Sequence, residues 1–282
     1  MRKILVGLMG LGLLTWGAHA RAVPLVGEWL LDEGSGQTAA DTSGHGLDAQ
    51  LGSSPAVDSS DPTWFTDGSV TGQHFQAGTY DEVPFDPLLE PLSVTLEVRA
   101  RWNDPVNQPG SASYLAAKPG GLGPSYGLYT GAGSMARGIY FAIGYSSGGS
   151  TGFLAAGQGW LWDTAWHTFV GSWDASTSTA RLWRDGQLLA TRTAPVSIAY
   201  DGSPFRIGSF AKSTLFTFQG DIDFVRLYDR ALAPDQLAAI PEPPAWALLA
   251  AGLVSLSVLR YRRQRAATRG PDTASRTRSE AR

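Results

Sequence analysis

The stretch from Ser93 to Trp102 alternates between apolar and polar residues over its whole length. Successive side chains of a β-strand point to opposite faces, so a period of two predicts a strand with one face in a hydrophobic core and the other in water. The apolar positions are Val94, Leu96, Val98, Ala100 and Trp102, and the polar positions are Thr95, Glu97, Arg99 and Arg101. This strand must therefore lie in a sheet that covers a core.

The composition supports an all-β fold. The 282-residue chain contains 34 glycines, 17 prolines and 10 tryptophans. Glycine and proline favour turns, whereas aromatic and β-branched residues favour strands. Because both ends of the chain are expected to be targeting signals, residues 22–240 are left to form one large domain. The chain has no cysteine, so this domain depends on its core without disulfide bonds.

Charge is segregated along the chain. Residues 21–240 contain 12 basic and 22 acidic residues, whereas residues 241–282 contain 8 basic and 3 acidic residues. An acidic body argues against nucleic-acid binding by the folded domain. A basic tail suits the cytoplasmic flank of a membrane segment.

Several segments of the body carry recognisable motifs. A short apolar strand with Trp29 runs into two glycine-rich turns, and Asp185-Gly186 has the composition of a tight hairpin turn. The segments are Gly27–Gly36, Ala40–Asp48, Trp166–Asp174, Ala180–Ala190 and Gly220–Leu232. In this order they resemble the LamG-like jelly-roll domain, and the resemblance covers residues 25–235. It implies a two-sheet antiparallel jelly-roll sandwich of the concanavalin A-like lectin/glucanase type.

Residues 1–20 have the layout of a secretory signal peptide. Arg2 and Lys3 give a positive start, residues 4–14 are apolar, and Ala18 and Ala20 are small residues at the positions that signal peptidase recognises. We expect cleavage after Ala20 and export through the Sec machinery. The alternative is an uncleaved anchor or a buried helix.

A three-part pattern stands at the C-terminal end. A Pro-Glu-Pro triplet precedes an apolar stretch, and a basic cluster follows it; the residues are Pro241, Glu242, Pro243, then 244–259, then Arg260, Arg262 and Arg263. This order resembles the PEP-CTERM sorting signal of Gram-negative bacteria that make extracellular polysaccharide, over residues 241–265. The resemblance implies processing by exosortase, a membrane protease-transpeptidase.

The apolar stretch 244–259 has the length of a short membrane span. In a helix these residues extend over about 24 Å, slightly less than the hydrocarbon core of a bilayer. The arginines that follow would hold this end on the cytoplasmic side. We expect a transmembrane helix that anchors the protein before processing, and a polar, disordered tail over 266–282. The alternative is a single-span anchor that is never cut, and both readings place the protein at the cell surface or in the extracellular matrix.

Four aspartates are candidate ligands of a structural Ca²⁺. Asp223 shares a strand parity with Val225 and Leu227, so an Asp223 that faced the core would need a cation or several donors. Ca²⁺ prefers carboxylate and carbonyl oxygens, and the LamG-like resemblance implies calcium near these elements. The expected ligands are Asp32, Asp41, Asp48 and Asp223. The alternative is that Asp41 and Asp48 form Asx-type turns while Asp223 pairs with an arginine or a backbone N–H.

The sequence argues against catalysis. Related β-jelly-roll glucanases place alternate carboxylates on one concave face in the pattern Glu-x-Asp-x-x-Glu. Asp221 and Asp223 lack the third acid, and Asp81 and Glu82 occupy adjacent positions that face opposite ways. His167 is expected to pack or to form hydrogen bonds, because no cysteine and no Ser-Asp partner pattern accompanies it.

Tryptophans are the candidate contacts for a sugar. Trp166 and Trp173 belong to a strand that fills the core and are expected to be buried. Trp160 and Trp162 precede this strand and are the expected ligand-binding residues. The sequence thus predicts an exported, non-enzymatic module that binds polysaccharide or protein. The alternatives are a glycan-active hydrolase and a purely structural matrix protein.

Overall fold

The computed structural model describes residues 25–103, 112–121, 123–131, 138–147, 150–159, 163–212 and 215–237. The signal peptide with Ala18 and Ala20, the whole sorting signal (241–265) and the polar tail lie outside these residues. Trp160 and Trp162 also lie outside them. Within the described ranges, no helix is both long enough and apolar enough to cross a membrane.

Sixteen strands in two antiparallel sheets make up the described part of the chain. Sheet A contains, in spatial order, β14 (Gln187–Thr193), β13 (Thr179–Arg184), β12 (His167–Asp174), β7 (Val94–Trp102), β16 (Gly220–Tyr228), β5 (Val70–Phe75) and β4 (Thr63–Asp67), and β1 (Leu25–Trp29) also pairs with β16. Sheet B contains β11 (Ser150–Gly159), β10 (Gly138–Ser147), β9 (Gly123–Thr130), β8 (Ser113–Gly120), β15 (Phe205–Ile207), β6 (Asp81–Val83), β3 (Ala49–Leu51) and β2 (Thr38–Ala39). Two short helices complete the set, the 3₁₀-helix η1 (Pro87–Leu89) and α1 (Pro234–Leu237).

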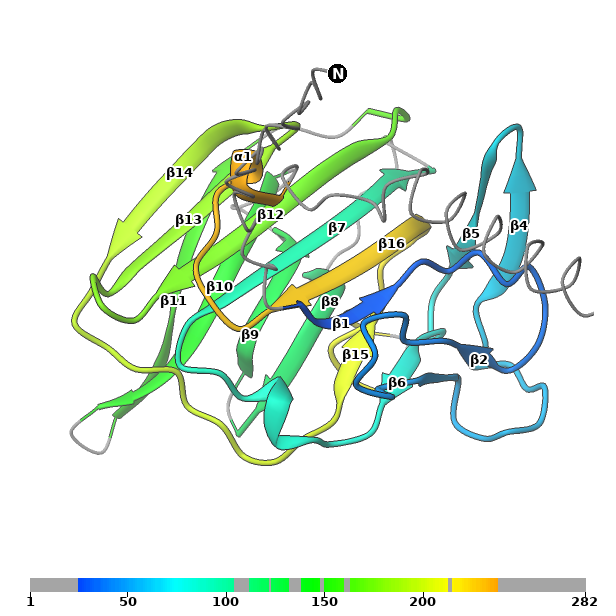
Figure 1. Ribbon diagram of the computed structural model, residues 1–282, viewed down its shortest axis with the longest axis horizontal. Helices are drawn as coiled ribbons and strands as arrows, with labels where there is room; N and C mark the ends of the chain where they lie inside the picture. The colour runs from blue at the N-terminus through cyan, green and yellow to red at the C-terminus, as the bar shows by residue number, and fades with distance from the viewer. Residues whose placement is uncertain are drawn as a thin grey trace, which may run out of the picture. The chain divides into compact units, whose positions relative to one another are not determined.

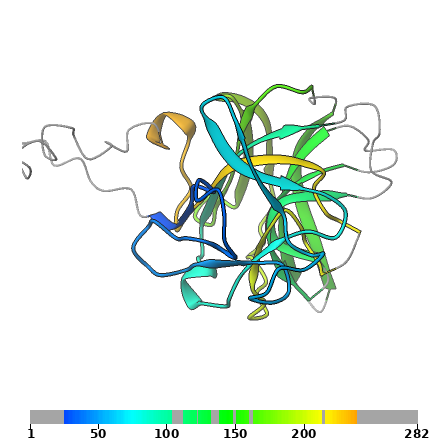
Figure 2. The same ribbon diagram turned by 90° about the vertical axis from the view of Figure 1, so that its right-hand side faces the viewer.

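The two sheets pack face to face. Sheet A faces the viewer in Figure 1 with sheet B behind it, and the turned view of Figure 2 shows them as stacked layers. This arrangement confirms the predicted two-sheet antiparallel sandwich. The apolar positions of β7 face the core as predicted, since Val94, Leu96, Val98 and Ala100 are fully buried.

The predicted hairpin turn at Asp185-Gly186 is also confirmed. It joins β13 to β14, and Arg184 pairs with Gln187 across it. Both turn residues adopt positive φ angles, +50° for Asp185 and +80° for Gly186. Aspartate followed by glycine tolerates this conformation better than most residue pairs, which is why the sequence signalled a two-residue turn.

Asp223 does not face the core, although it shares a strand parity with Val225 and Leu227. The register of β16 against β7 shifts between Ile222, which pairs with Ala100, and Phe224, which pairs with Arg99. This β-bulge inserts one residue, so the alternation of faces is broken at Asp223. Ile222 and Val225 still face the core, whereas the Asp223 side chain turns outward and forms an ion pair with Arg99.

Candidate functional site

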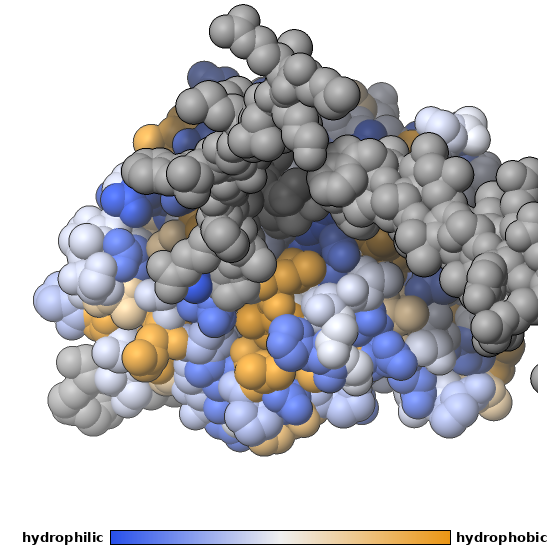
Figure 3. Space-filling view, in the orientation of Figure 1, coloured by the Kyte–Doolittle hydropathy of each residue, from blue (hydrophilic) through white to orange (hydrophobic). Residues whose placement is uncertain are grey.

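A cluster of aromatic and charged side chains covers part of the outer face of sheet A. It spans β4, β5, β16 and β7, which are neighbours in the sheet, and reaches the residue before β12. We call it the Trp166 patch and define it as Phe65, Asp67, His74, Arg99, Arg101, Asn103, Trp166, Asp221 and Asp223. Where described residues are visible on this face, hydrophobic and hydrophilic residues stand side by side (Figure 3).

Two aromatic rings form the apolar part of the patch. The ring centroids of Phe65 and Trp166 are 6.3 Å apart and their planes differ by 18°. The Arg101 guanidinium lies 4.9 Å from the Trp166 centroid and 5.6 Å from the Phe65 centroid. That of Arg99 lies 5.1 Å from the Trp166 centroid. These cation–π contacts hold both rings in place while each stays partly exposed.

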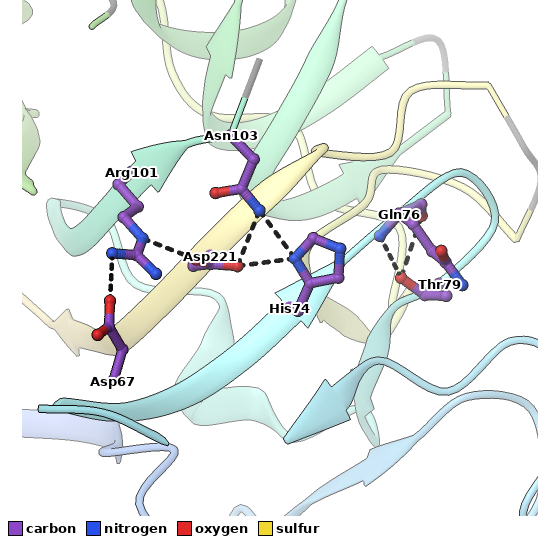
Figure 4. Close-up of polar contacts among 7 residues, drawn as sticks. All are labelled: Asp67, His74, Gln76, Thr79, Arg101, Asn103 and Asp221. Atoms are coloured by element: carbon purple, nitrogen blue, oxygen red, sulfur yellow. Dashed lines mark hydrogen bonds and ion pairs between the residues drawn. The ribbon is translucent and has the colours of Figure 1, made fainter. Parts of the chain in front are cut away.

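Asp221 organises the polar part. Arg101 donates from Nε to Asp221 Oδ2 at 2.7 Å and from a terminal nitrogen to Asp67 at 2.8 Å. On the other side, His74 Nδ1 lies 2.7 Å from Asp221 Oδ1, and the Asn103 amide donates to the same oxygen at 3.1 Å. Figure 4 shows Arg101, His74 and Asn103 converging on Asp221, while Asp67 contacts Arg101. The Asp221 side chain is 5% exposed, so its charge is buried but well compensated.

The patch combines the two kinds of contact that small polar ligands need. Its rings offer flat apolar surface, and its guanidinium, carboxylate and amide groups offer donors and acceptors in fixed positions. Arg99 and its partner Asp223 remain 31% and 18% exposed, so their free edges reach solvent. The carboxylates of Asp67 and Asp221 are both engaged by Arg101.

A family model for the concanavalin A-like lectin/glucanases superfamily matches residues 71–238. The chain belongs to this superfamily. The matched segment includes β5, β7 and β16, which carry most of the patch. No curated protein matches the chain.

Two solved structures show the same concanavalin A-like fold. Domain 4 of AbnA, a GH43 extracellular arabinanase from Geobacillus stearothermophilus in complex with arabinotriose, is 13% identical with a TM-score of 0.56, and the match covers 79% of this chain and 100% of that domain. The Trypanosoma rangeli sialidase in complex with sialic acid is 17% identical with a TM-score of 0.51, covering 77% of this chain. The chain spans only 32% of the sialidase.

The loop from Asp41 to Asp48 of this concanavalin A-like domain is held by hydrogen bonds within the loop and to β1. Asp41 accepts from the backbone N–H groups of Glu28, Ser43 and Leu47 at 2.9–3.0 Å. Asp48 accepts from the Asp41 N–H at 2.8 Å. Partial burial acts to raise the pKa of Asp41, but the hydrogen bonds outweigh it, so this pKa is lowered. Asp41 therefore forms the Asx-type turn of the alternative through the Ser43 N–H, whereas Asp48 reaches back to the Asp41 N–H and forms no such turn.

The four expected calcium ligands are not all brought together. Asp41 and Asp48 lie in one loop and Asp32 is exposed, whereas Asp223 pairs with Arg99 on the outer face of sheet A. Across the described residues, no group of three or more histidine, aspartate and glutamate side chains is placed to hold a metal ion. The structure therefore gives three of the expected donors, Asp41, Asp48 and Asp223, other partners.

His167 and Trp173 lie where the sequence predicted, and Trp166 does not. His167 bonds to Asp185 at 2.6 Å and to Asp163 at 3.0 Å, and Trp173 is fully buried. Trp166 is partly exposed on the outer face. It stands an odd number of positions from Trp173, so the two must face opposite ways along a strand. That parity could have revealed Trp166, whereas nothing in the sequence singled out Phe65.

Glu97, beside the patch on β7, gives a pH prediction. It is 8% exposed and burial raises its pKa above the usual 4.5, although Arg226 at 3.7 Å and the Tyr228 hydroxyl at 3.2 Å offset part of this. A carboxyl whose pKa is raised by folding adds stability at low pH, and this contribution is lost as the pH rises through the folded pKa. The unfolding free energy of the wild type minus that of Glu97→Gln should therefore fall as the pH rises above the usual carboxyl pKa of 4.5.

Urea unfolding of both proteins across this pH range checks the Glu97 prediction. Arg226 keeps Glu28 as a partner at 2.7 Å in the variant, so no buried cation is stranded. A difference that is constant or rises with pH would contradict the inferred direction.

Proposed function

We propose that this protein is an exported, non-enzymatic module that binds polysaccharide on the Trp166 patch. The observation that carries the proposal is the pair of partly exposed rings, Trp166 and Phe65, fixed by Arg99 and Arg101 beside an ordered set of polar groups. Membership of the concanavalin A-like lectin/glucanases superfamily supports it. So does the arabinotriose bound by the similar AbnA domain.

The chemistry of the patch suits a sugar ring. A pyranose or furanose has a C–H face that packs on an aromatic ring and an edge of hydroxyl groups that both donate and accept hydrogen bonds. The rings serve the first need, and the planar guanidinium and carboxylate edges serve the second. Because Arg101 already fixes the Asp67 carboxylate, whose side chain is 61% exposed, a ligand would meet a preorganised acceptor and lose less entropy on binding.

The same contacts favour binding over hydrolysis. A glycosidase needs one carboxyl group as acid and a second as base or nucleophile on either side of the scissile bond. In the patch, Asp221 is buried under His74, Asn103 and Arg101, and Asp223 is held by Arg99. Their oxygens are therefore engaged in structural contacts.

Replacing Trp166 with alanine tests the site. We expect polysaccharide binding to weaken at least about tenfold, because a central aromatic contact commonly contributes at least the corresponding 1.4 kcal/mol. Phe85 is a matched control, being 48% exposed on the segment between β6 and η1, outside the patch. Titration calorimetry against arabinan, xylan, glucan and anionic bacterial polysaccharides measures the affinities. Trp166→Ala should bind at least about tenfold more weakly than the wild type, and Phe85→Ala should bind with wild-type affinity. Equal affinities for both variants would place the site elsewhere, with Trp160 and Trp162 as the next residues to replace.

The targeting part of the proposal rests on the two ends of the sequence. Residues 1–20 and the PEP-CTERM pattern from Pro241 to Arg265 would bring the protein through the Sec machinery to an exosortase, with residues 244–259 anchoring it in the membrane before processing. Intact mass spectrometry on protein from cell envelope and medium tests this. We expect a mass that lacks residues 1–20 and the segment beyond Pro243. A mass that retains the tail would indicate a permanent anchor.

A further inference from the structure

A group of buried polar side chains lies between the two sheets and is not used by the patch. Asp81 on β6 and Gln73 on β5 are both 0% exposed. Neither carboxylate oxygen of Asp81 and neither polar atom of the Gln73 amide has a hydrogen-bond partner within the described structure. Buried polar groups are nearly always hydrogen-bonded, so four unpartnered atoms on two neighbouring side chains need an explanation.

The strand registers point these side chains into the same space. Asp81 shares its face of β6 with the buried Val83, and it pairs with Leu51 on β3 and Ile207 on β15, both in the core. From the other sheet, Gln73 shares its face of β5 with the buried Phe75. The two side chains therefore face the interior from opposite layers.

Two further oxygens belong to this group. The Leu51 N–H donates to the Gln37 carbonyl, so Gln37 continues the row of Asp81 and Leu51 across sheet B, and its side-chain Oε1 is buried and unpartnered in the described part of the chain. Asp61 is 9% exposed, and its Oδ1 is also buried without a partner among these residues.

Gly52 makes room for the Asp61 carboxylate. It has a φ of +63°, and a Cβ at this position would come within 2.1 Å of Asp61 Oδ1. Any other residue would be strained and would also displace the carboxylate. The glycine after β3 thus leaves room for the buried Oδ1 of Asp61, a carboxylate close enough for its charge to act on Asp81.

Electrostatics show that Asp81 is poorly accommodated without a counter-charge. Burial raises its pKa well above the usual value, and the negative charges of Glu33 and Asp61 raise it further. The Gln73 amide offsets this only in part and makes no hydrogen bond of ordinary geometry with it. A buried carboxylate needs a cation or several donors, yet the neighbouring groups supply chiefly acceptor oxygens.

We propose that Asp81, Asp61, Gln73 and Gln37 bind a calcium ion inside the sandwich. Carboxylate and amide carbonyl oxygens are the ligands that Ca²⁺ prefers, with flexible geometry and more than four positions to fill. The ion would neutralise the two carboxylates and satisfy the unpartnered oxygens. It would also link β6 and the segment before β2, in sheet B, to β5 in sheet A.

Calorimetry and thermal unfolding of the EDTA-treated protein test the site. We expect one Ca²⁺ per chain and a rise in Tm of about 5–10 °C at a hundredfold excess over the dissociation constant. Asp81→Asn should abolish both the binding and the rise in Tm, and Gln73→Met should weaken binding at least tenfold. Mg²⁺ should bind more weakly, because it demands a tighter octahedral shell.

Asp48→Asn is the matched control, since Asp48 lies in the Asp41 loop that the sequence pointed to. It should keep the calcium response. The proposal would be overturned if the wild type neither bound Ca²⁺ nor gained Tm. It would also be overturned if Asp48→Asn lost the response while Asp81→Asn kept it. In EDTA, Asp81→Asn should unfold at the wild-type temperature or above it, because an uncompensated charge is removed. A lower Tm in EDTA would show that the carboxylate is needed without a cation and would contradict the inference.

Discussion

Replacement of Trp29 by alanine is expected to lower the free energy of unfolding by about 3–5 kcal/mol. Trp29 is 0% exposed on β1 of sheet A, and its ring stacks on Phe205 of sheet B with centroids 5.4 Å apart. Its Nε1 donates to the Leu47 carbonyl at 2.8 Å. Truncation would thus leave a cavity between the sheets and a buried carbonyl without its donor. Urea unfolding at 25 °C measures the loss.

Trp64→Ala is the control for Trp29. The Trp64 Nε1 also donates to a backbone carbonyl, that of Gly36 at 3.0 Å, but its ring is only partly buried at the edge of the core. Its loss should cost about 1–2 kcal/mol. Equal losses for the two variants would show that Trp29 does not join the sheets as described.

Replacement of Arg101 by alanine is expected to cost about 2–4 kcal/mol, less than the loss of one partner from a fully buried ion pair because Arg101 is 24% exposed. The change strands the Asp221 carboxylate, which is 5% exposed, and frees the Trp166 and Phe65 rings. Polysaccharide binding should weaken as well, because the rings and Asp67 lose their common support.

A double-mutant cycle separates the two effects of the Arg101 change. Adding Asp221→Asn to Arg101→Ala removes the stranded charge and should restore part of the stability but not the binding. Arg230→Ala is the surface control, since Arg230 and Asp229 are 41% and 48% exposed, and it should cost under about 1 kcal/mol. A double variant no more stable than Arg101→Ala would mean that the stranded charge is not the cause.

The fold could be predicted where local patterns were long or chemically restricted. Ten residues of alternation from Ser93 to Trp102 are enough to assign the core face of β7, although Thr95 and Glu97 on its other face are buried and not in water as predicted. Asp185-Gly186 is one of few pairs suited to positive φ. The bulge at Asp223 could not be predicted, because a single inserted residue leaves no mark in the apolar pattern.

The patch and the Asp81 cluster arise from tertiary pairing. Arg101, Asp221 and His74 lie far apart in the chain and meet only because β7, β16 and β5 are neighbours in sheet A. Asp81 stands on a three-residue strand, too short for a period to show which way it points. The sequence only argued against a catalytic role for Asp81, and the register with Leu51 and Ile207 is what places it inside.

The proposed function has two parts, namely that the protein binds polysaccharide on sheet A and that it does not cleave it. The most direct test incubates the purified protein with each candidate polysaccharide, measures retention of the protein on the polymer, and then determines the chain length of the recovered polymer. We predict that one polysaccharide class retains the wild type but not Trp166→Ala, with its chain length unchanged. A shortened polymer would contradict the non-enzymatic account, and a protein that no polysaccharide retains would contradict the binding account.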